Sequence, residues 1–504
     1  MSNIARKIAD VKTAPKIGTN SSANRQNRRK LYLVPALADY TPSTALTDAG
    51  NATRLLERHG NVMHYVPAWK SWIIWNGSKW EKDELGRAWL CAEDTLKKLY
   101  SSAGETDDAN ERKALAKFAL GCESEKKLRS MLAIAQHRPG IPVSTEALDA
   151  DQMLFNCANG TINLTLGTFK ANDPDDLCTK QTDVEYNPRA ECPTWTSFLD
   201  KILGSNQALI SFLQRAIGYA MTGLTSEQSL FILHGNGSNG KSTLIDVLMR
   251  LFCEYAINTP ASTLLAKKSD APTYDLARLK GVRFVAASET NEQDKMAEST
   301  VKSLTGDKTI TARLLYGNPF SFSPLCKIFL ATNNKPIIQG KDYGIWRRVK
   351  LIPFSVTIPE EEKDLELYDK LLAELPGILN WAIQGCLAWQ QEGLNPPAEV
   401  LQATQEYQQE MDSFSQFLDE ECIFAANTSC TAKELYARYC QWSDDNGEKP
   451  DSQKRFGSAL LKKKGIDKYK SGVYYYSGIR PRKDDDNPPT RTTWPRPSGV
   501  TTCW

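Results

Sequence analysis

Between residues 195 and 360, apolar residues follow two alternating patterns. Some segments are continuous apolar runs of strand length, and between them lie segments whose apolar residues recur every three or four positions, as in helices. Continuous apolar runs are typical of parallel strands buried on both faces, and their alternation with helices indicates an α/β sheet. The predicted strands are Phe231–Leu233, Tyr255–Ile257, Val282–Ala287, Lys327–Ala331 and Val349–Ile352.

The segments before and after this region predict further parts of the chain. We expect residues 45–195 to form a mainly helical α+β N-terminal domain, 196–360 the sheet domain, and 361–411 a helical lid or spacer. An aromatic hairpin is expected at Trp72–Trp80, with Asn76-Gly77 as its turn. Its tryptophans favour the core of a small subdomain, and stacking on nucleic-acid bases is the alternative. Helices are predicted over 87–137 and short strands with loops over 150–190.

Residues 412–480 predict a C-terminal domain of different design. Three helices are expected to begin near Ser413, Thr431 and Ser452, and a hairpin follows at Tyr469–Tyr475. Three helices and a hairpin are typical of a winged helix. The end segments 1–44 and 481–504 are predicted to be disordered. The first is basic, so it either binds phosphate backbones or remains a solvated tail.

A glycine-rich segment lies between the first predicted strand and a helix. It fits the pattern G-x-x-x-x-G-K-[ST] of phosphate-binding P-loops. Glycines let backbone N–H groups curl around an anion, and the positive end of the next helix adds to that field. Lys241 is expected to reach the β- and γ-phosphates of ATP, and the Ser242 hydroxyl to hold Mg²⁺. The predicted nucleotide-binding residues are Gly235, Asn236, Gly237, Ser238, Asn239, Gly240, Lys241, Ser242 and Thr243.

Three later features complete a candidate catalytic site. Glu289 follows a strand at the sheet edge where α/β proteins bind ligands, and we expect it to hold Mg²⁺ through water and to orient the attacking water, with Glu292 sharing this work. Asn333 follows the next strand, and its uncharged amide can donate to the γ-phosphate or the attacking water. Arg347 and Arg348 come 14 and 15 residues after it, and an arginine from a neighbouring subunit can stabilise phosphoryl transfer. Each signal alone is weak, but together they predict an ATPase.

The order of these motifs resembles superfamily 3 helicases. More narrowly, the chain is similar to the phage and plasmid primase–helicase branch that poxviruses share, over roughly residues 45–480. The resemblance rests on Ala287-Ser288-Glu289, Thr332-Asn333-Asn334-Lys335-Pro336, Ile345-Trp346-Arg347-Arg348, Asn159–Leu164, Gly218-Tyr219 and Pro376–Trp381.

This resemblance implies a ring, expected to be a hexamer, of AAA+-like subunits with ATP sites between them. It also implies translocation on single-stranded or forked DNA, typically 3′ to 5′, during replication of a phage, plasmid or mobile element in the cytoplasm of a bacterial host. The family often carries a primase domain ahead of the helicase. Here Asp149-Ala150-Asp151 is the one acid pair in that half that could suggest two-metal nucleotidyl transfer, and we interpret it as a turn. No primer synthesis is therefore expected, and a separate primase or polymerase partner is left open.

The resemblance also gives a role to the hairpin predicted just before the fourth strand. In helicases of this class such a hairpin projects into the ring channel, so Tyr316 is expected to stack on DNA, with Lys308 and Arg313 contacting phosphates. The alternative is an ordinary hairpin with a buried tyrosine. Lys454 and Arg455 on the third helix of the predicted winged helix are further DNA-contact candidates, against a solvated basic face.

Bulk properties exclude some classes of protein. The net charge of +2 over 504 residues gives no evidence for or against nucleic-acid binding. No apolar run approaches the ~18 residues of a membrane span, and the start of the chain lacks a signal-peptide core. The 12 cysteines form no CxxC pair, which argues against a zinc ribbon and fits a reducing compartment. The four histidines show no metal-ligand spacing.

Two other functions remain open. In a replication initiator or origin-binding protein, ATP would switch assembly, and the C-terminal domain would act without processive unwinding. In a small-molecule kinase, catalysis would need no arginine from a second subunit.

Overall fold

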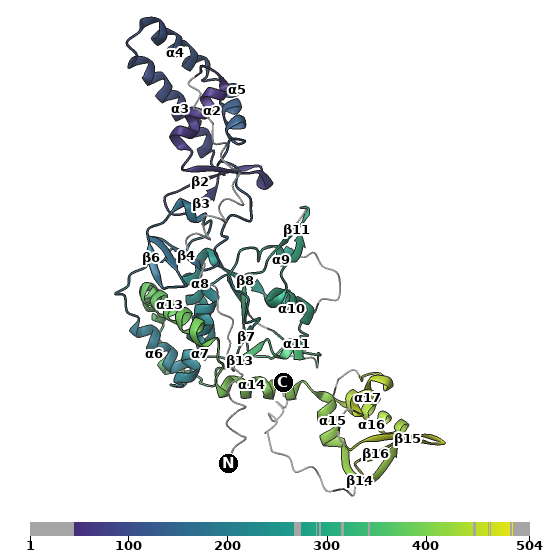
Figure 1. The fold of residues 1–504 in the computed structure, drawn as a ribbon. Helices are drawn as coiled ribbons and strands as arrows, with labels where there is room; N and C mark the ends of the chain where they lie inside the picture. The colour runs from purple at the N-terminus through teal and green to yellow at the C-terminus, as the bar shows by residue number, and fades with distance from the viewer. Residues whose placement is uncertain are drawn as a thin grey trace, which may run out of the picture.

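Five parallel strands form a sheet at the centre of the chain (Figure 1). The computed structural model describes residues 45–266, 274–288, 290–291, 294–313, 317–340, 343–446, 450–461, 463, 465–483 and 486. Each of the five predicted strands overlaps one strand of the sheet, which confirms the mixed α/β fold with a parallel sheet. From edge to edge the strands are β13 (Val349–Pro353), β7 (Leu230–His234), β12 (Lys327–Thr332), β9 (Phe284–Ser288) and β8 (Ala256–Pro260).

Alternate residues of these strands enter two hydrophobic clusters, one on each face of the sheet. On one face the Phe329 ring stacks on the Phe231 ring at a centroid distance of 4.6 Å and on the Phe284 ring at 4.8 Å. On the other face Ile232 and Leu330 belong to the second cluster. Because both faces are covered, most positions in the middle of these strands are apolar, and this is why the strands appear in the sequence as continuous apolar runs.

Helices cover both faces of the sheet (Figure 1). The phenylalanine face is covered by α6 (Pro193–Ile202), α7 (Gln207–Met221), α8 (Lys241–Phe252), α12 (Leu367–Ala373) and α13 (Leu375–Glu392). The opposite face carries α9 (Tyr274–Ala277), α10 (Glu298–Gly306), α11 (Tyr343–Trp346) and α14 (Ala398–Glu410). Among the described residues, no single helix is long and apolar enough to cross a bilayer. The bent pair Glu360–Ala373 and α13 passes that test jointly, and α13 lies in the core.

The N-terminal part extends away from the central sheet (Figure 1). Its helices are α2 (Asp48–His59), α3 (Arg87–Gly104), α4 (Ala109–Gly121) and α5 (Glu125–Ala135), and its antiparallel strands are β1 (Met63–Val66), β2 (Ser71–Trp75) and β3 (Trp80–Lys82). Trp75 pairs with Trp80 across the predicted hairpin. Trp80 is only 1% exposed, and its Nε1 donates to the Pro174 oxygen at 2.9 Å. This tryptophan is therefore a core residue and is not available to stack on a base.

A second antiparallel sheet connects this part to the central sheet. Its strands are β4 (Leu154–Cys157), β5 (Gly160–Asn163) and β6 (Thr168–Lys170), with turns at the predicted Asn159-Gly160 and Leu166-Gly167 positions.

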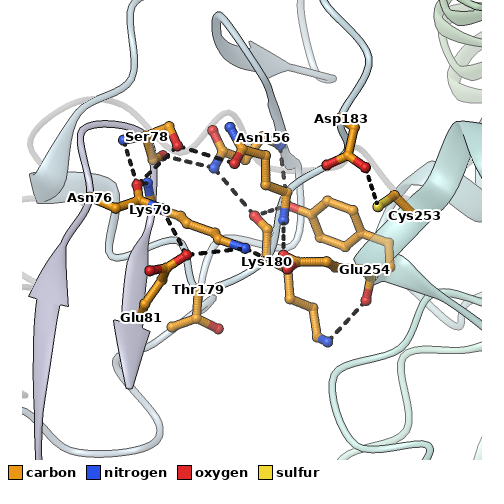
Figure 2. Close-up of polar contacts among 12 residues, drawn as sticks. Asn76, Ser78, Lys79, Glu81, Asn156, Thr179, Lys180, Asp183, Cys253 and Glu254 are labelled. Carbon is orange, nitrogen blue, oxygen red and sulfur yellow. Dashed lines mark hydrogen bonds and ion pairs between the residues drawn. The ribbon is translucent and has the colours of Figure 1, made fainter. Parts of the chain in front are cut away.

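Polar contacts join this connecting sheet, the β2–β3 hairpin and the end of α8 (Figure 2). Glu254 lies two residues beyond α8, and its carboxylate pairs with Lys79. The same carboxylate accepts the Gln181 backbone N–H at 2.9 Å, and Lys180 Nζ donates to the Glu254 backbone oxygen at 3.0 Å. The far end of α8 is thus fixed to the N-terminal part of the chain.

Two buried cations lie where the central sheet meets the end of α7. Arg283, just before β9, donates to the Met221 backbone oxygen at 2.6 Å. Lys327, the first residue of β12, donates to the Thr222 oxygen, and its Nζ lies 4.9 Å from the centroid of the Tyr219 ring. Burial lowers the pKa of Lys327 well below its ordinary value. Backbone oxygens at a helix C-terminus carry partial negative charge, so they are suitable partners for both cations.

The C-terminal part contains three helices and a three-stranded sheet (Figure 1). Its elements are α15 (Ser413–Glu421), β14 (Cys422–Thr431), α16 (Ala432–Asp445), α17 (Gln453–Leu460), β15 (Asp467–Ser471) and β16 (Val473–Pro481). Thr431 caps α16 as predicted, because its Oγ1 accepts the Glu434 N–H at 3.1 Å. Strand β14 was not predicted, since its register is interrupted between Phe424 and Ser429 and alternation is lost there.

Gly218 of α7 and Gly385 of α13 lie where these helices touch. A Cβ atom at Gly218 would lie 2.0 Å from Cys386 N, and one at Gly385 would lie 2.1 Å from the Gln214 oxygen. In an open helix Gly→Ala stabilises by up to about 1 kcal/mol. We expect Gly218→Ala instead to lower the free energy of unfolding by roughly 1–3 kcal/mol, because the helices must separate. Urea denaturation followed by circular dichroism measures this.

The matched control is Gly121→Ala at the end of α4, where a Cβ would meet no atom within 4 Å. It is expected to leave stability unchanged or to raise it slightly. Equal behaviour of the two variants would contradict the helix contact.

Candidate functional site

The glycine loop, residues 235–240, connects β7 to α8 and needs its glycines for space and for backbone conformation. A Cβ at Gly235 would lie 2.1 Å from the Phe354 oxygen. Gly240 has φ +80°, a left-handed conformation, and a Cβ there would lie 2.5 Å from Ile202 Cγ2. The loop is therefore held tightly at both ends. Asn236, Gly237 and Ser238 in its middle are exposed.

Lys241 is the first residue of α8, and its side chain turns back across the glycine loop. Its Nζ donates to the Gly235 oxygen at 2.6 Å, to Asn239 Oδ1 at 3.0 Å and to Asn333 Oδ1 at 3.1 Å. All three acceptors are uncharged. Burial lowers the pKa of Lys241, as expected for an ammonium without a carboxylate partner in these contacts. An anion bound beside the loop would supply the missing negative charge.

Asn333 reaches Lys241 because β7 and β12 are neighbours in the sheet. Thr332, which ends β12, pairs with His234, which ends β7. After β7 the chain continues to β8, which is the outermost strand beyond β12 and β9. The last strand, β13, lies on the other side of β7, so the strand order reverses direction at β7. Ligands of open α/β sheets bind at the carboxyl ends of the strands, at this kind of reversal in strand order. The structure thus brings together the two predicted residues Lys241 and Asn333 at such an edge.

A hydroxyl and amide network fixes the segment around Asn333. Thr290 Oγ1 lies 2.6 Å from Thr332 Oγ1 and donates to the Asn334 oxygen at 2.5 Å. Asn334 Nδ2 donates back to the Thr290 oxygen at 3.0 Å. Sequence analysis assigned no role to Thr290, which directly follows Glu289, and indicated Asn334 only as part of the motif Thr332–Pro336. Glu289 and Glu292 lie outside the described residues.

Ser242 and Thr243 occupy the first turn of α8, with the Ser242 side chain exposed and Thr243 half-buried. The exposed Ser242 hydroxyl lies at the positive end of α8, and helix ends of this kind bind phosphates. An oxygen at this position is a suitable ligand for Mg²⁺ beside a phosphate chain. Among the described residues, no group of three or more His, Cys, Asp or Glu side chains could hold a metal by itself.

Arg347 and Arg348 lie at the amino ends of the strands, whereas the glycine loop lies at their carboxyl ends. The Arg348 oxygen accepts the Leu230 N–H at 2.8 Å, where β7 begins, whereas the glycine loop follows the end of β7. One chain therefore does not bring its arginines to its own loop. Arg348 is buried, and its Nε donates to Thr305 Oγ1 at 3.0 Å. Arg347 is exposed, and it donates to Gln228 Oε1.

The remaining predicted contact residues lie on two exposed elements. Strands β10 (Ile310–Arg313) and β11 (Pro319–Phe322) form the expected antiparallel hairpin, with Lys308 and Arg313 exposed; Tyr316 lies outside the described residues. Arg313 Nε donates to the Gly317 oxygen at 2.8 Å. Lys454 and Arg455 are exposed on α17.

Asp149 and Asp151 serve local structure. Asp149 has φ +52°, and its carboxylate accepts the Thr179 N–H at 2.8 Å. Asp151 Oδ1 accepts the Met153 N–H at 3.0 Å. These contacts agree with the interpretation of this acid pair as a turn.

Family models match two segments of the chain. Residues 52–204 match "D5 N terminal like", and residues 233–348 match a family of unknown function, DUF5906. A candidate helicase of Acanthamoeba polyphaga mimivirus is 30% identical over 324 residues, which cover 59% of this chain and 34% of that protein. A candidate helicase of Frog virus 3 is 28% identical and covers 51% of this chain and 29% of the relative.

The chain is similar to viral proteins of the primase and helicase type. A candidate primase of African swine fever virus is 27% identical and covers 41% of the primase–helicase-like chain and 22% of the relative. The chain spans about a third or less of the length of these curated relatives. The solved apo structure of the NrS-1 C-terminal region superposes with a TM-score of 0.47 at 13% identity, covering 79% of each chain.

Thr290→Val tests the network that fixes the Asn333 segment. The substitution keeps the volume but leaves the buried Thr332 hydroxyl and Asn334 oxygen without this partner. Because Thr332 Oγ1 still donates to the Asn334 oxygen at 2.7 Å, we expect the free energy of unfolding to fall by roughly 0.5–1.5 kcal/mol in urea denaturation. Thr290→Ser keeps the hydroxyl and is expected to lose less than half as much. A larger loss in the serine variant would show that packing of the methyl group, and not hydrogen bonding, is decisive.

Proposed function

We propose that this primase–helicase-like chain is an ATP-dependent DNA helicase that acts as a ring. The observation that carries the proposal is the 3.1 Å contact between Lys241, at the end of the glycine loop, and Asn333, at the end of the neighbouring strand. A cation and an amide at the carboxyl edge of a parallel sheet are suited to a triphosphate and its attacking water. The helicase names of the viral relatives support the same function.

In this mechanism the glycine loop binds the phosphates through its backbone N–H groups, and Lys241 neutralises the β- and γ-oxygens. On binding, Lys241 exchanges its uncharged oxygen partners for phosphate. Ser242 and Glu289 would hold Mg²⁺, and the ion would supply positive charge to offset that of the phosphates. Asn333 positions the water, and Glu289 orients it as general base.

The arginines act on the nucleotide of the adjacent subunit. Because they lie at the opposite edge of the sheet from the glycine loop of their own chain, a ring can place them against the next loop. Arg347 is the exposed member and is the proposed catalytic arginine, whereas Arg348 supports it from within the fold. This arrangement favours a hexameric ring with ATP at each interface.

DNA passes along the ring axis in this proposal. The β10–β11 hairpin presents Lys308, Arg313 and Tyr316 to single-stranded or forked DNA, and α17 presents Lys454 and Arg455 from a winged-helix domain. The activity would serve replication of a phage, virus, plasmid or other mobile element, with a separate primase or polymerase as partner. An ATP-switched initiator that binds an origin without processive unwinding is the second candidate, because the C-terminal part has its own basic helix.

Lys241→Ala is expected to lower ATPase turnover and forked-duplex unwinding by at least about 10²-fold, because the β- and γ-phosphates lose their cation. Binding of single-stranded DNA is expected to stay within about twofold of the unsubstituted chain. Strand displacement of a fluorescent fork measures this. If the unsubstituted chain hydrolyses ATP but separates no strands, the initiator is the correct function.

A mixture of Lys241→Ala and Arg347→Ala chains tests the shared site. Alone, Lys241→Ala is expected to lose at least about 10²-fold in ATPase rate and Arg347→Ala at least about 10³-fold. In freely exchanged rings, about a quarter of interfaces combine an intact loop with an intact arginine, so about a quarter of the activity should return. A kinase-like site within one chain would restore none. Arg347→Lys serves as the control for charge without guanidinium geometry.

A further inference from the structure

The β15–β16 hairpin forms an exposed ribbon that the site described above does not use. Strand β15 is the outer strand of the sheet β14-β16-β15, and all five of its residues are exposed. The turn is made at Gly472, with φ +71°, and the ribbon points away from the rest of the chain (Figure 1). Both faces of the ribbon near its tip are therefore accessible to a ligand.

One face of the ribbon combines cations with a tyrosine. Lys470 pairs with Tyr474 across the strands, and Lys468 lies two residues away on the same face. The Lys468 ammonium lies 4.4 Å from the centroid of the Tyr474 ring, and that of Lys470 lies 5.7 Å away. Within the described part of the chain, neither lysine forms an ion pair with a carboxylate. Their charges are therefore available to an external anion.

The other face carries a stacked aromatic pair. The rings of Tyr469 and Tyr475 lie 5.3 Å apart at an interplanar angle of 12°. Tyr469 is 44% exposed and Tyr474 is 51% exposed, although neither ring is needed to fill the core of this part. Exposed aromatic rings beside unpaired lysines are the two components that single-stranded nucleic-acid sites combine.

We propose that the β15–β16 hairpin binds single-stranded DNA, with Tyr469 and Tyr474 stacking on unpaired bases and Lys468 and Lys470 contacting phosphates. Duplex DNA offers its phosphates but keeps its bases stacked, so it can use the lysines and not the rings. These residues are different from Lys454 and Arg455 on α17. It deepens the proposed function, since the ligand is the strand on which the ring would move.

The test measures fluorescence anisotropy of the full chain with a labelled oligothymidine and with a duplex, both without nucleotide. Tyr469→Ala with Tyr474→Ala is expected to weaken single-strand binding about tenfold or more and duplex binding less than about twofold. Lys468→Ala with Lys470→Ala should weaken both and reduce the salt dependence. Phenylalanine at both tyrosine positions keeps the rings and should restore single-strand binding.

Tyr100→Ala with Lys113→Ala, two exposed positions in α3 and α4, is the matched control and should change neither affinity. Circular dichroism checks folding of every variant. Equal losses on duplex and single strand in the tyrosine variant, or no loss on either, would overturn the proposal. Because no ATP is present, this outcome is independent of hydrolysis, so a chain without ATPase activity could still bind through the hairpin.

Discussion

A buried ammonium with three uncharged partners is the constraint on which the candidate site depends. Lys241 and Asn333 are 92 positions apart, and they meet because two parallel strands end side by side. The glycines of the loop allow the backbone to pass closely enough for Lys241 to turn back on it. The Thr290 network holds the opposite side of the contact. Burying the Lys241 ammonium without a carboxylate partner costs free energy. Its charge is therefore available to an anion that binds beside the loop.

The sequence predicted the central sheet and the glycine loop well, and the reason is physical. Strands buried on both faces are mostly apolar, and the loop needs glycine where a Cβ would collide, at Gly235, and where φ is positive, at Gly240. Less periodic elements were missed: β14 is interrupted between Phe424 and Ser429, and so shows no alternation. Buried Lys327 and Arg283 also resemble surface residues in a sequence, because their carbonyl partners come from the distant end of α7.

The order of motifs in the sequence grouped the candidate site residues, and the fold adds their positions relative to one another. The sequence led us to expect Arg347 and Arg348 to serve a neighbouring subunit, and in the fold they lie the length of β7 away from the glycine loop of their own chain. In a parallel sheet all amino ends of the strands lie on one side and all carboxyl ends on the other. Residues before a strand and residues after it therefore lie on opposite sides. Only the three-dimensional fold distinguishes the buried Arg348 from the exposed Arg347.

Helix α8 connects the glycine loop to the N-terminal part of the chain. Its first residue, Lys241, touches the glycine loop, and just past its last turn Glu254 holds Lys79 of the N-terminal hairpin. The helix is about 18 Å long and stiff along its axis. This connection fixes the spacing between the glycine loop and the β2–β3 hairpin, from whose side of the molecule helices α3–α5 extend (Figure 1).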